Sequence, residues 1–185
     1  TVYPESLPSF TISNNKVCSN SSVAFTNTSQ NAVSYVWNFN DGTESTNQTS
    51  PSHVFVNNTT VTEYIAVELI STSAEGCIDT VTNYINLYPL PIATFTTDKA
   101  DFCSPSAVHL TTASGARTYF WDYGDGNSEY ATEDVTHIYD NLTENNIVYT
   151  VSLTATSMQN CSNTTQTTLT AHPNSKAFFT VSKAT

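Results

Sequence analysis

The sequence of 185 residues has few charged side chains and very few basic ones. Five lysines and arginines stand against 16 aspartates and glutamates, which gives a formal net charge of −11. A chain this acidic is a poor partner for nucleic acid or an anionic membrane, because both carry negative charge. No apolar run reaches membrane-spanning length, and no basic-then-apolar leader opens the sequence. We therefore expect neither nucleic-acid binding nor membrane insertion in this segment, and we expect any leader to lie outside it.

The sequence also lacks the common signatures of catalysis and metal binding. Gly-x-Ser-x-Gly and His-Glu-x-x-His do not occur, and no Cys-x-x-Cys or Cys/His cluster supplies zinc ligands. No window keeps the helical periodicity of an amphipathic helix. The polar residues are mostly threonine, serine and asparagine, which suit the exposed faces of strands. These features predict an all-β chain that is not an enzyme.

One stretch of the sequence occurs twice. Positions 35–42, Tyr-Val-Trp-Asn-Phe-Asn-Asp-Gly, return at positions 119–126 as Tyr-Phe-Trp-Asp-Tyr-Gly-Asp-Gly. Alternate aromatic residues fall on one face of a strand, and Asp-Gly favours a tight turn. A histidine two positions before an aromatic follows in each copy, and we expect it to be partly buried and hydrogen-bonded beside the tryptophan strand. The predicted structural motif consists of Trp37, Asp41, Gly42, His53, Trp121, Asp125, Gly126 and His137.

Other identities recur at the same offset, including Leu69 with Leu153 and Pro89 with Pro173. Short alternating strands separated by turn residues predict antiparallel β-sandwiches, each ending in a long strand at 78–87 or 162–171. The Pro89-Leu90-Pro91 link favours an extended connection, so we expect the sandwiches to form an end-to-end, semi-rigid rod. The predicted parts are the tail of a preceding repeat at 1–7, sandwiches at 8–89 and 90–173, and the start of a following repeat at 174–185.

Four cysteines permit three pairings. Repeat symmetry favours Cys18 with Cys77 and Cys103 with Cys161, which gives one disulfide within each domain. Closing a loop of this length stabilises a small domain by on the order of 4 kcal/mol in the chain-entropy account. Because disulfides persist in oxidising surroundings, the pairs predict a secreted or cell-surface protein.

The repeated motif resembles a known signature. Trp-x-(Phe/Tyr)-x-Asp-Gly, followed by Pro-Ser-His-Val-Phe at 51–55 or Val-Thr-His-Ile-Tyr at 135–139, is similar to the pattern of PKD domains, which are immunoglobulin-like modules. The second copy matches nearly position for position, whereas Asn38 and Asn40 depart from the pattern in the first. The resemblance implies two tandem immunoglobulin-like sandwiches. Closely spaced repeats with these cysteines also resemble those of large surface proteins of Bacteroidota, including adhesins associated with gliding motility.

This resemblance implies a non-catalytic structural and adhesive repeat of a long extracellular surface protein, acting as a stiff spacer and cell-surface adhesion module. The alternative is an accessory PKD module of a secreted hydrolase, such as a protease or chitinase, that positions the catalytic domain or binds its polymeric substrate. Neighbouring repeats of the same chain are the first expected partners. Surface polysaccharide and other cell-surface proteins are further candidates.

No cofactor is required by these expectations. Asp98 and Asp101 form the one candidate calcium site, because clustered carboxylates near a domain junction suit that ion. Several Asn-x-Ser/Thr sites, Asn141 among them, allow N-glycosylation without showing that it occurs.

Overall fold

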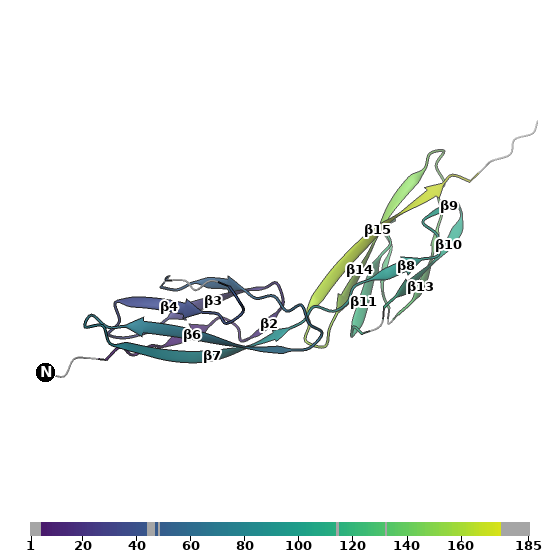
Figure 1. Ribbon diagram of the computed structural model, residues 1–185. Helices are drawn as coiled ribbons and strands as arrows, with labels where there is room; N and C mark the ends of the chain where they lie inside the picture. The colour runs from purple at the N-terminus through teal and green to yellow at the C-terminus, as the bar shows by residue number, and fades with distance from the viewer. Residues whose placement is uncertain (1–4, 44–46, 48, 114, 132, 175–185) are drawn as a thin grey trace, which may run out of the picture. The chain divides into compact units, whose positions relative to one another are not determined.

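The computed structural model describes residues 5–43, 47, 49–113, 115–131 and 133–174. The chain forms two compact units, Thr1–Leu90 and Pro91–Thr185, which we call the first and second repeat. The described residues form strands and no helix (Figure 1). Within them there is accordingly no helix that could span a membrane. The predicted pieces of neighbouring repeats at 1–7 and 174–185 lie largely outside the described residues.

The first repeat is built from two sheets. One contains β1 (Phe10–Ile12), β3 (Ser22–Asn27) and β5 (Ser52–Val54), and the other contains, in spatial order, β2 (Lys16–Cys18), β7 (Ile78–Tyr88), β6 (Glu63–Thr72) and β4 (Ser34–Asn38). The paired strands are antiparallel except for β2 and β7, which are parallel. The tryptophan strand β4 pairs with β6, which places Trp37 opposite Leu69.

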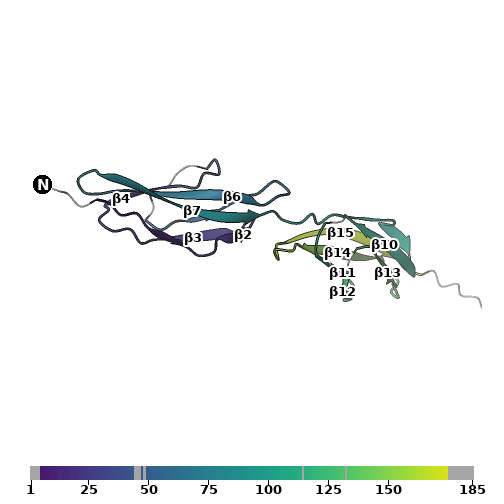
Figure 2. The same cartoon turned by 90° about the horizontal axis from the view of Figure 1, so that it is seen from below.

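The second repeat has the same plan (Figures 1 and 2). One sheet contains β8 (Phe95–Thr97), β10 (Ser106–Thr112) and β13 (Val135–Tyr139), and the other contains, in order, β12 (Ser128–Ala131), β11 (Thr118–Asp122), β14 (Ile147–Thr156), β15 (Ser162–His172) and β9 (Asp101–Cys103). Here β9 runs parallel to β15. The short edge strand β12 pairs with the tryptophan strand β11.

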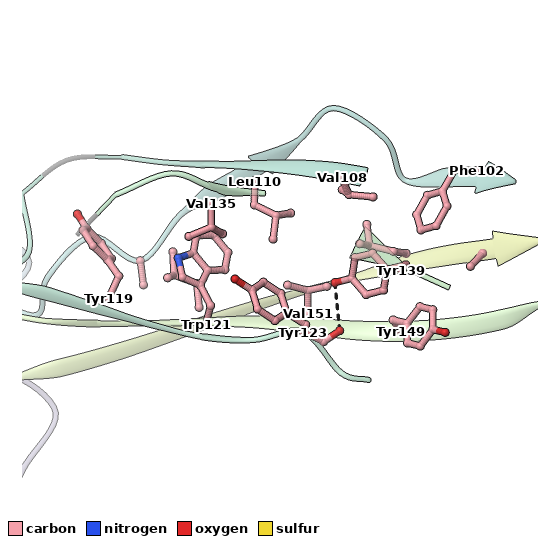
Figure 3. Packing of buried hydrophobic residues seen from close by; sticks show 14 of the residues in the cluster. Phe102, Val108, Leu110, Tyr119, Trp121, Tyr123, Val135, Tyr139, Tyr149 and Val151 are labelled. Carbon is pink, nitrogen blue, oxygen red and sulfur yellow. Dashed lines mark hydrogen bonds between the residues drawn. The ribbon is translucent and has the colours of Figure 1, made fainter. Parts of the chain in front are cut away.

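Each repeat encloses one core centred on its tryptophan. Trp37 and Trp121 are fully buried, and each meets a phenylalanine of the opposite sheet edge-on, Phe10 at 4.9 Å and Phe95 at 5.0 Å between ring centroids. Figure 3 shows Trp121 in the layer of side chains between the two sheets. Inward and outward residues alternate along the strands, because successive side chains of a strand point to opposite faces.

The predicted all-β class with two tandem immunoglobulin-like sandwiches is confirmed. The last strands, expected at 78–87 and 162–171, are found at Ile78–Tyr88 and Ser162–His172. Three short elements were not predicted: the parallel edge strands β2 and β9, and the edge strand β12. The two parallel strands end in Cys18 and Cys103, and their pairing places these cysteines beside the ends of β7 and β15.

Candidate functional site

A histidine and an aspartate are hydrogen-bonded at the same place in each repeat. Nε2 of His53, in β5, lies 2.7 Å from Oδ2 of Asp41, in the turn that follows β4. His137 and Asp125 make the same contact at 2.7 Å in the second repeat. Each pair therefore ties the turn after the tryptophan strand to a strand of the opposite sheet.

An aromatic ring covers one face of each imidazole. His53 stacks on Phe39 with ring centroids 4.0 Å apart, and His137 stacks on Tyr123 at 3.8 Å. A second aromatic ring packs against the edge of each histidine. The hydrogen bond that each ring makes in the described part of the chain is to the aspartate of its own repeat. The geometry is that of a structural tie.

The turn itself depends on left-handed backbone. Gly42 and Gly126, which directly follow the two aspartates, have φ of 86° and 92°, a conformation that glycine adopts without steric cost. Asn40 is also left-handed, with φ of 51°, and its side-chain amide donates to the carbonyl of Ala66 at 3.0 Å. The departure of the first copy from the motif at Asn40 thus keeps the turn and adds a hydrogen bond to β6.

The environment favours the ionised form of both aspartates. Partial burial of Asp41 opposes ionisation, but hydrogen bonds from Thr43 and His53 outweigh burial and hold its pKa below the usual value. The pKa of Asp125 is lowered in the same way, since hydrogen bonds from His137 and Asn127 outweigh partial burial. A carboxylate with a depressed folded-state pKa stabilises the fold above its unfolded-state pKa.

Asp125→Asn is expected to lower the free energy of unfolding of the second repeat by about 1–2 kcal/mol at neutral pH, because the charge-assisted bond to His137 is lost. The stabilisation is present above the unfolded-state pKa near 4 and disappears as the pH falls through the lower folded-state pKa. Urea unfolding followed by hydrogen exchange, at pH 7 and near pH 3, measures this. Glu144→Gln, on an exposed residue, is the charge-matched control. A deficit of equal size at both pH values would contradict the assignment.

Sequence reasoning missed a buried asparagine in the loop that follows β5 in the first repeat and β13 in the second. The amide group of Asn141, which is fully buried, donates to the carbonyls of Asn145 and Ala171 at 2.8 Å each, and its Oδ1 accepts from the backbone nitrogen of Thr143 at 2.9 Å. Asn57 repeats this pattern at the equivalent position of the first repeat. The recurrence at the repeat spacing, each time as Asn-x-Thr, is the sequence signal that could have found it. Because the amide is enclosed, the glycosylation site at Asn141 is not accessible in the folded repeat.

Asn141→Ala is expected to cost the second repeat about 2–3 kcal/mol of unfolding free energy, since buried carbonyls lose their donors. Thermal unfolding followed by circular dichroism measures the loss. Asn174→Ala, at an exposed asparagine outside the strands, is the control that removes the same group without buried partners. Equal melting temperatures for the two variants would refute the role of Asn141.

The predicted disulfides within each repeat are wrong. Cys18 is in register with Tyr88, at the end of β7, whereas Cys77 directly precedes Ile78, where β7 begins. A strand of 11 residues spans roughly 35 Å at ~3.3 Å per residue, whereas the Cα atoms of a disulfide lie within about 7 Å. Cys18 and Cys77 therefore cannot bond within their repeat.

The second repeat has the same arrangement. Cys103 is in register with His172 at the end of β15, and Cys161 directly precedes the start of β15. Cys18 and Cys161 each take part in a disulfide, whereas Cys77 and Cys103 are exposed free thiols. Repeat symmetry identified equivalent positions correctly but could not show which positions are neighbours.

The candidate calcium ligands are engaged separately. Oδ1 of Asp98 accepts from the backbone nitrogen of His109 at 2.8 Å, and Oδ1 of Asp101 lies 2.6 Å from Nε2 of His172. In the part of the chain that the structure describes, no three His, Cys, Asp or Glu side chains gather as a metal site. A calcium site at Asp98 and Asp101 stays a prediction.

Comparison with known proteins gives one family. The sequence profile of the PKD domain matches residues 6–87 and 90–171. No curated protein is significantly similar in sequence. Among solved structures, the PKD1 domain of the Vibrio cholerae metalloprotease PrtV has 24% identity and a TM-score of 0.39, covering 46% of this chain and 99% of its own. The PKD1 domain of Vibrio anguillarum Epp has 22% identity and a TM-score of 0.37, with 46% and 96% covered. A 1.5-MDa bacterial ice-binding adhesin has 14% identity and a TM-score of 0.36, with 94% and 67% covered.

Proposed function

Because this chain belongs to the PKD domain family, with domains at residues 6–87 and 90–171, we propose that it is a structural and adhesive repeat of a long extracellular surface protein. PKD domains are non-catalytic modules. In both repeats, the hydrogen-bonded histidine and aspartate connect the turn after the tryptophan strand to the opposite sheet. In this proposal the segment acts as a stiff spacer that holds an adhesive surface away from the cell. The host would be a Bacteroidota surface protein of the kind that supports gliding motility.

The observation that carries the proposal is that the two repeats share their interior and differ on their surface. The tryptophan, the histidine–aspartate tie and the buried asparagine recur at equivalent positions of the two repeats. The exposed aromatics do not recur: Tyr64 is 75% exposed and its counterpart is Val148, while Tyr84 is 64% exposed and its counterpart is Thr168. Selection for a shared ligand would repeat the surface, whereas a spacer requires only the same fold.

Two further features support an extracellular spacer. The disulfide-bonded state of Cys18 and of Cys161 suits an oxidising environment. The link Pro89-Leu90-Pro91 is short and contains two prolines, whose fixed φ restricts the chain. The accessory-module alternative requires a polymer-binding face or an attached catalytic domain.

Stiffness and polymer binding can be tested on the same protein. Small-angle X-ray scattering of the chain is expected to give a narrow range of dimensions, and a variant with Pro89→Gly and Pro91→Gly a broader one. Sedimentation with insoluble chitin, cellulose and cell-wall polysaccharide is expected to leave the protein in solution. When both proteins are measured after reduction of their disulfides, an unchanged scattering profile in the glycine variant would refute the spacer role. Retention on one polymer that is abolished by Tyr64→Ala or Tyr84→Ala would favour the accessory module.

A further inference from the structure

Each repeat carries one cysteine at either end. We call the end where the chain of a repeat begins its leading end, and the end where its last strand stops its trailing end. In the first repeat, the hydroxyl of Ser6 is hydrogen-bonded to that of Ser71, close to the β6–β7 turn that contains Cys77. Cys77 is thus at the leading end. Cys18 is at the trailing end, because it is in register with Tyr88.

The second repeat has the same two positions. The amide of Asn163, which closely follows Cys161 in the chain, donates to the carbonyl of Pro91 at 3.1 Å, and Pro91 is the first residue of this unit. Cys161 is therefore at the leading end. Cys103 is in register with His172 at the trailing end, where the backbone nitrogen of Ser104 donates to the carbonyl of His172 at 3.0 Å.

Equivalent cysteines differ in their state. Cys77 and Cys161 occupy the leading-end position of their repeats, and Cys18 and Cys103 occupy the trailing-end position. One member of each pair, Cys161 and Cys18, is disulfide-bonded, while Cys77 and Cys103 are exposed free thiols. The leading-end cysteine is disulfide-bonded in the second repeat and free in the first, and the trailing-end cysteine is bonded in the first repeat and free in the second. The two cysteines of one repeat are a long strand apart, so neither free thiol has a partner within its own repeat.

We propose that Cys77 and Cys103 join this pair of repeats covalently to further PKD repeats of the same build. Cys103 bonds to the leading-end cysteine of a following repeat, and Cys77 bonds to the trailing-end cysteine of a preceding one. The partner is thus a PKD repeat that presents a cysteine at the complementary end, and a second copy of this chain meets that requirement. The contact is head-to-tail and open-ended, so it generates linear chains. Such bonds would link successive repeats of an array covalently through side chains as well as through the backbone. This inference does not depend on whether the array adheres to a ligand.

The chemistry is ordinary thiol–disulfide exchange with a low-molecular-weight disulfide such as oxidised glutathione. The thiolate of Cys103 attacks one sulfur of the oxidant, releases one reduced glutathione and leaves a mixed disulfide. The thiolate of Cys77 on the next copy attacks the Cys103 sulfur and releases the second glutathione. Two protein thiols lose two protons and two electrons, and one oxidised glutathione becomes two reduced molecules.

The test uses single-cysteine variants in a glutathione redox buffer. Wild-type protein is expected to form a ladder of covalent multimers on a non-reducing gel. Cys77→Ser alone and Cys103→Ser alone are each expected to stay monomeric, while an equal mixture of the two gives a covalent dimer. Combined cleavage after lysine, arginine and glutamate places the four cysteines in four different peptides, so mass spectrometry can identify the Cys77–Cys103 link.

A thiol moved away from the leading end provides the matched control. The variant Cys77→Ser, Thr80→Cys, Cys103→Ser keeps one exposed thiol, placed further along β7. It is expected to couple to the free Cys103 of the Cys77→Ser protein about tenfold more slowly, because the thiols do not meet head-to-tail. Dimers of either single variant that form as fast as the mixed dimer would overturn the proposal. No dimer in the mixture, with unchanged circular dichroism of both proteins, would also overturn it.

Discussion

Trp121→Ala is expected to lower the free energy of unfolding of the second repeat by about 4 kcal/mol, within the usual range for a buried tryptophan. Trp121 is fully buried, packs against Phe95 at 5.0 Å between ring centroids, and lies opposite Leu153 in the neighbouring strand. Alanine leaves a cavity between the two sheets, and the surrounding strands can close it only in part. A loss of this size is a large fraction of the stability of a small domain.

Trp121→Phe distinguishes the effect of lost side-chain volume on stability from the effect of the buried indole nitrogen. Among the atoms that the structure describes, the buried indole Nε1 of Trp121 has no hydrogen-bond acceptor. Phenylalanine removes that unsatisfied donor along with part of the volume, so we expect a smaller loss of about 1–2 kcal/mol. Tyr130→Ala, on a side chain that is 77% exposed, should change stability by about 0.5 kcal/mol or less.

Urea unfolding followed by peptide-level hydrogen exchange resolves the two repeats, and the first repeat serves as internal reference. A Trp121→Ala variant that loses less than about 1 kcal/mol would place the tryptophan outside the core, contrary to the structure.

Gly124→Ala is expected to cost the second repeat roughly 3–4 kcal/mol, combining strained backbone with overpacking. Gly124 has a φ of 75°, which L-residues with a Cβ rarely adopt. A Cβ built on it would lie 2.7 Å from the backbone nitrogen of Thr150 in β14 and closer still to the carbonyl oxygen. Strand backbone cannot move aside as a side chain can, because Thr150 is paired with Thr168 of the neighbouring strand β15.

Gly126→Ala is the matched control, since its φ of 92° is also left-handed but a Cβ there would meet nothing within 4 Å. It isolates the conformational strain, which we expect to be about 1–2 kcal/mol. Asn40 occupies the position of Gly124 in the first repeat, with left-handed backbone and a side chain that donates to the carbonyl of Ala66. Asn40→Ala should cost about 1–2 kcal/mol, from the lost hydrogen bond and from a backbone conformation that asparagine tolerates better than alanine. Chemical denaturation of the three variants measures the differences. Equal losses for Gly124→Ala and Gly126→Ala would show that the clash with Thr150 is absent.

The core and the turns could be predicted from the sequence because their signals are local. Alternation around Trp37 and Trp121 predicts a strand with one buried face, and Asp-Gly predicts the turn that ends it. The histidines were expected to be partly buried and hydrogen-bonded, but their partners, Asp41 and Asp125, lie 12 residues away and emerge only in the fold.

The sequence did not predict which strands pair when they lie far apart in the chain. The short strands β2 and β9 contain too few residues for alternation to be recognised, and they pair in parallel with the ends of β7 and β15. That register places Cys18 and Cys77 at opposite ends of β7, so the predicted disulfide between them cannot form. The buried Asn141 was missed because Asn-x-Thr is common in a chain this rich in asparagine and threonine, and nothing local shows that its amide spans two segments.

The most direct test of the account is a disulfide map of the monomeric chain, made before any glutathione is added, by alkylating the native protein, digesting it without reduction and sequencing the peptides by mass spectrometry. The structure places the two cysteines of each repeat at opposite ends of a long strand, β7 or β15. We predict that Cys77 and Cys103 are alkylated, and that Cys18 and Cys161 are recovered in disulfide linkage. A peptide that links Cys18 to Cys77, or Cys103 to Cys161, would contradict the strand register on which the account depends.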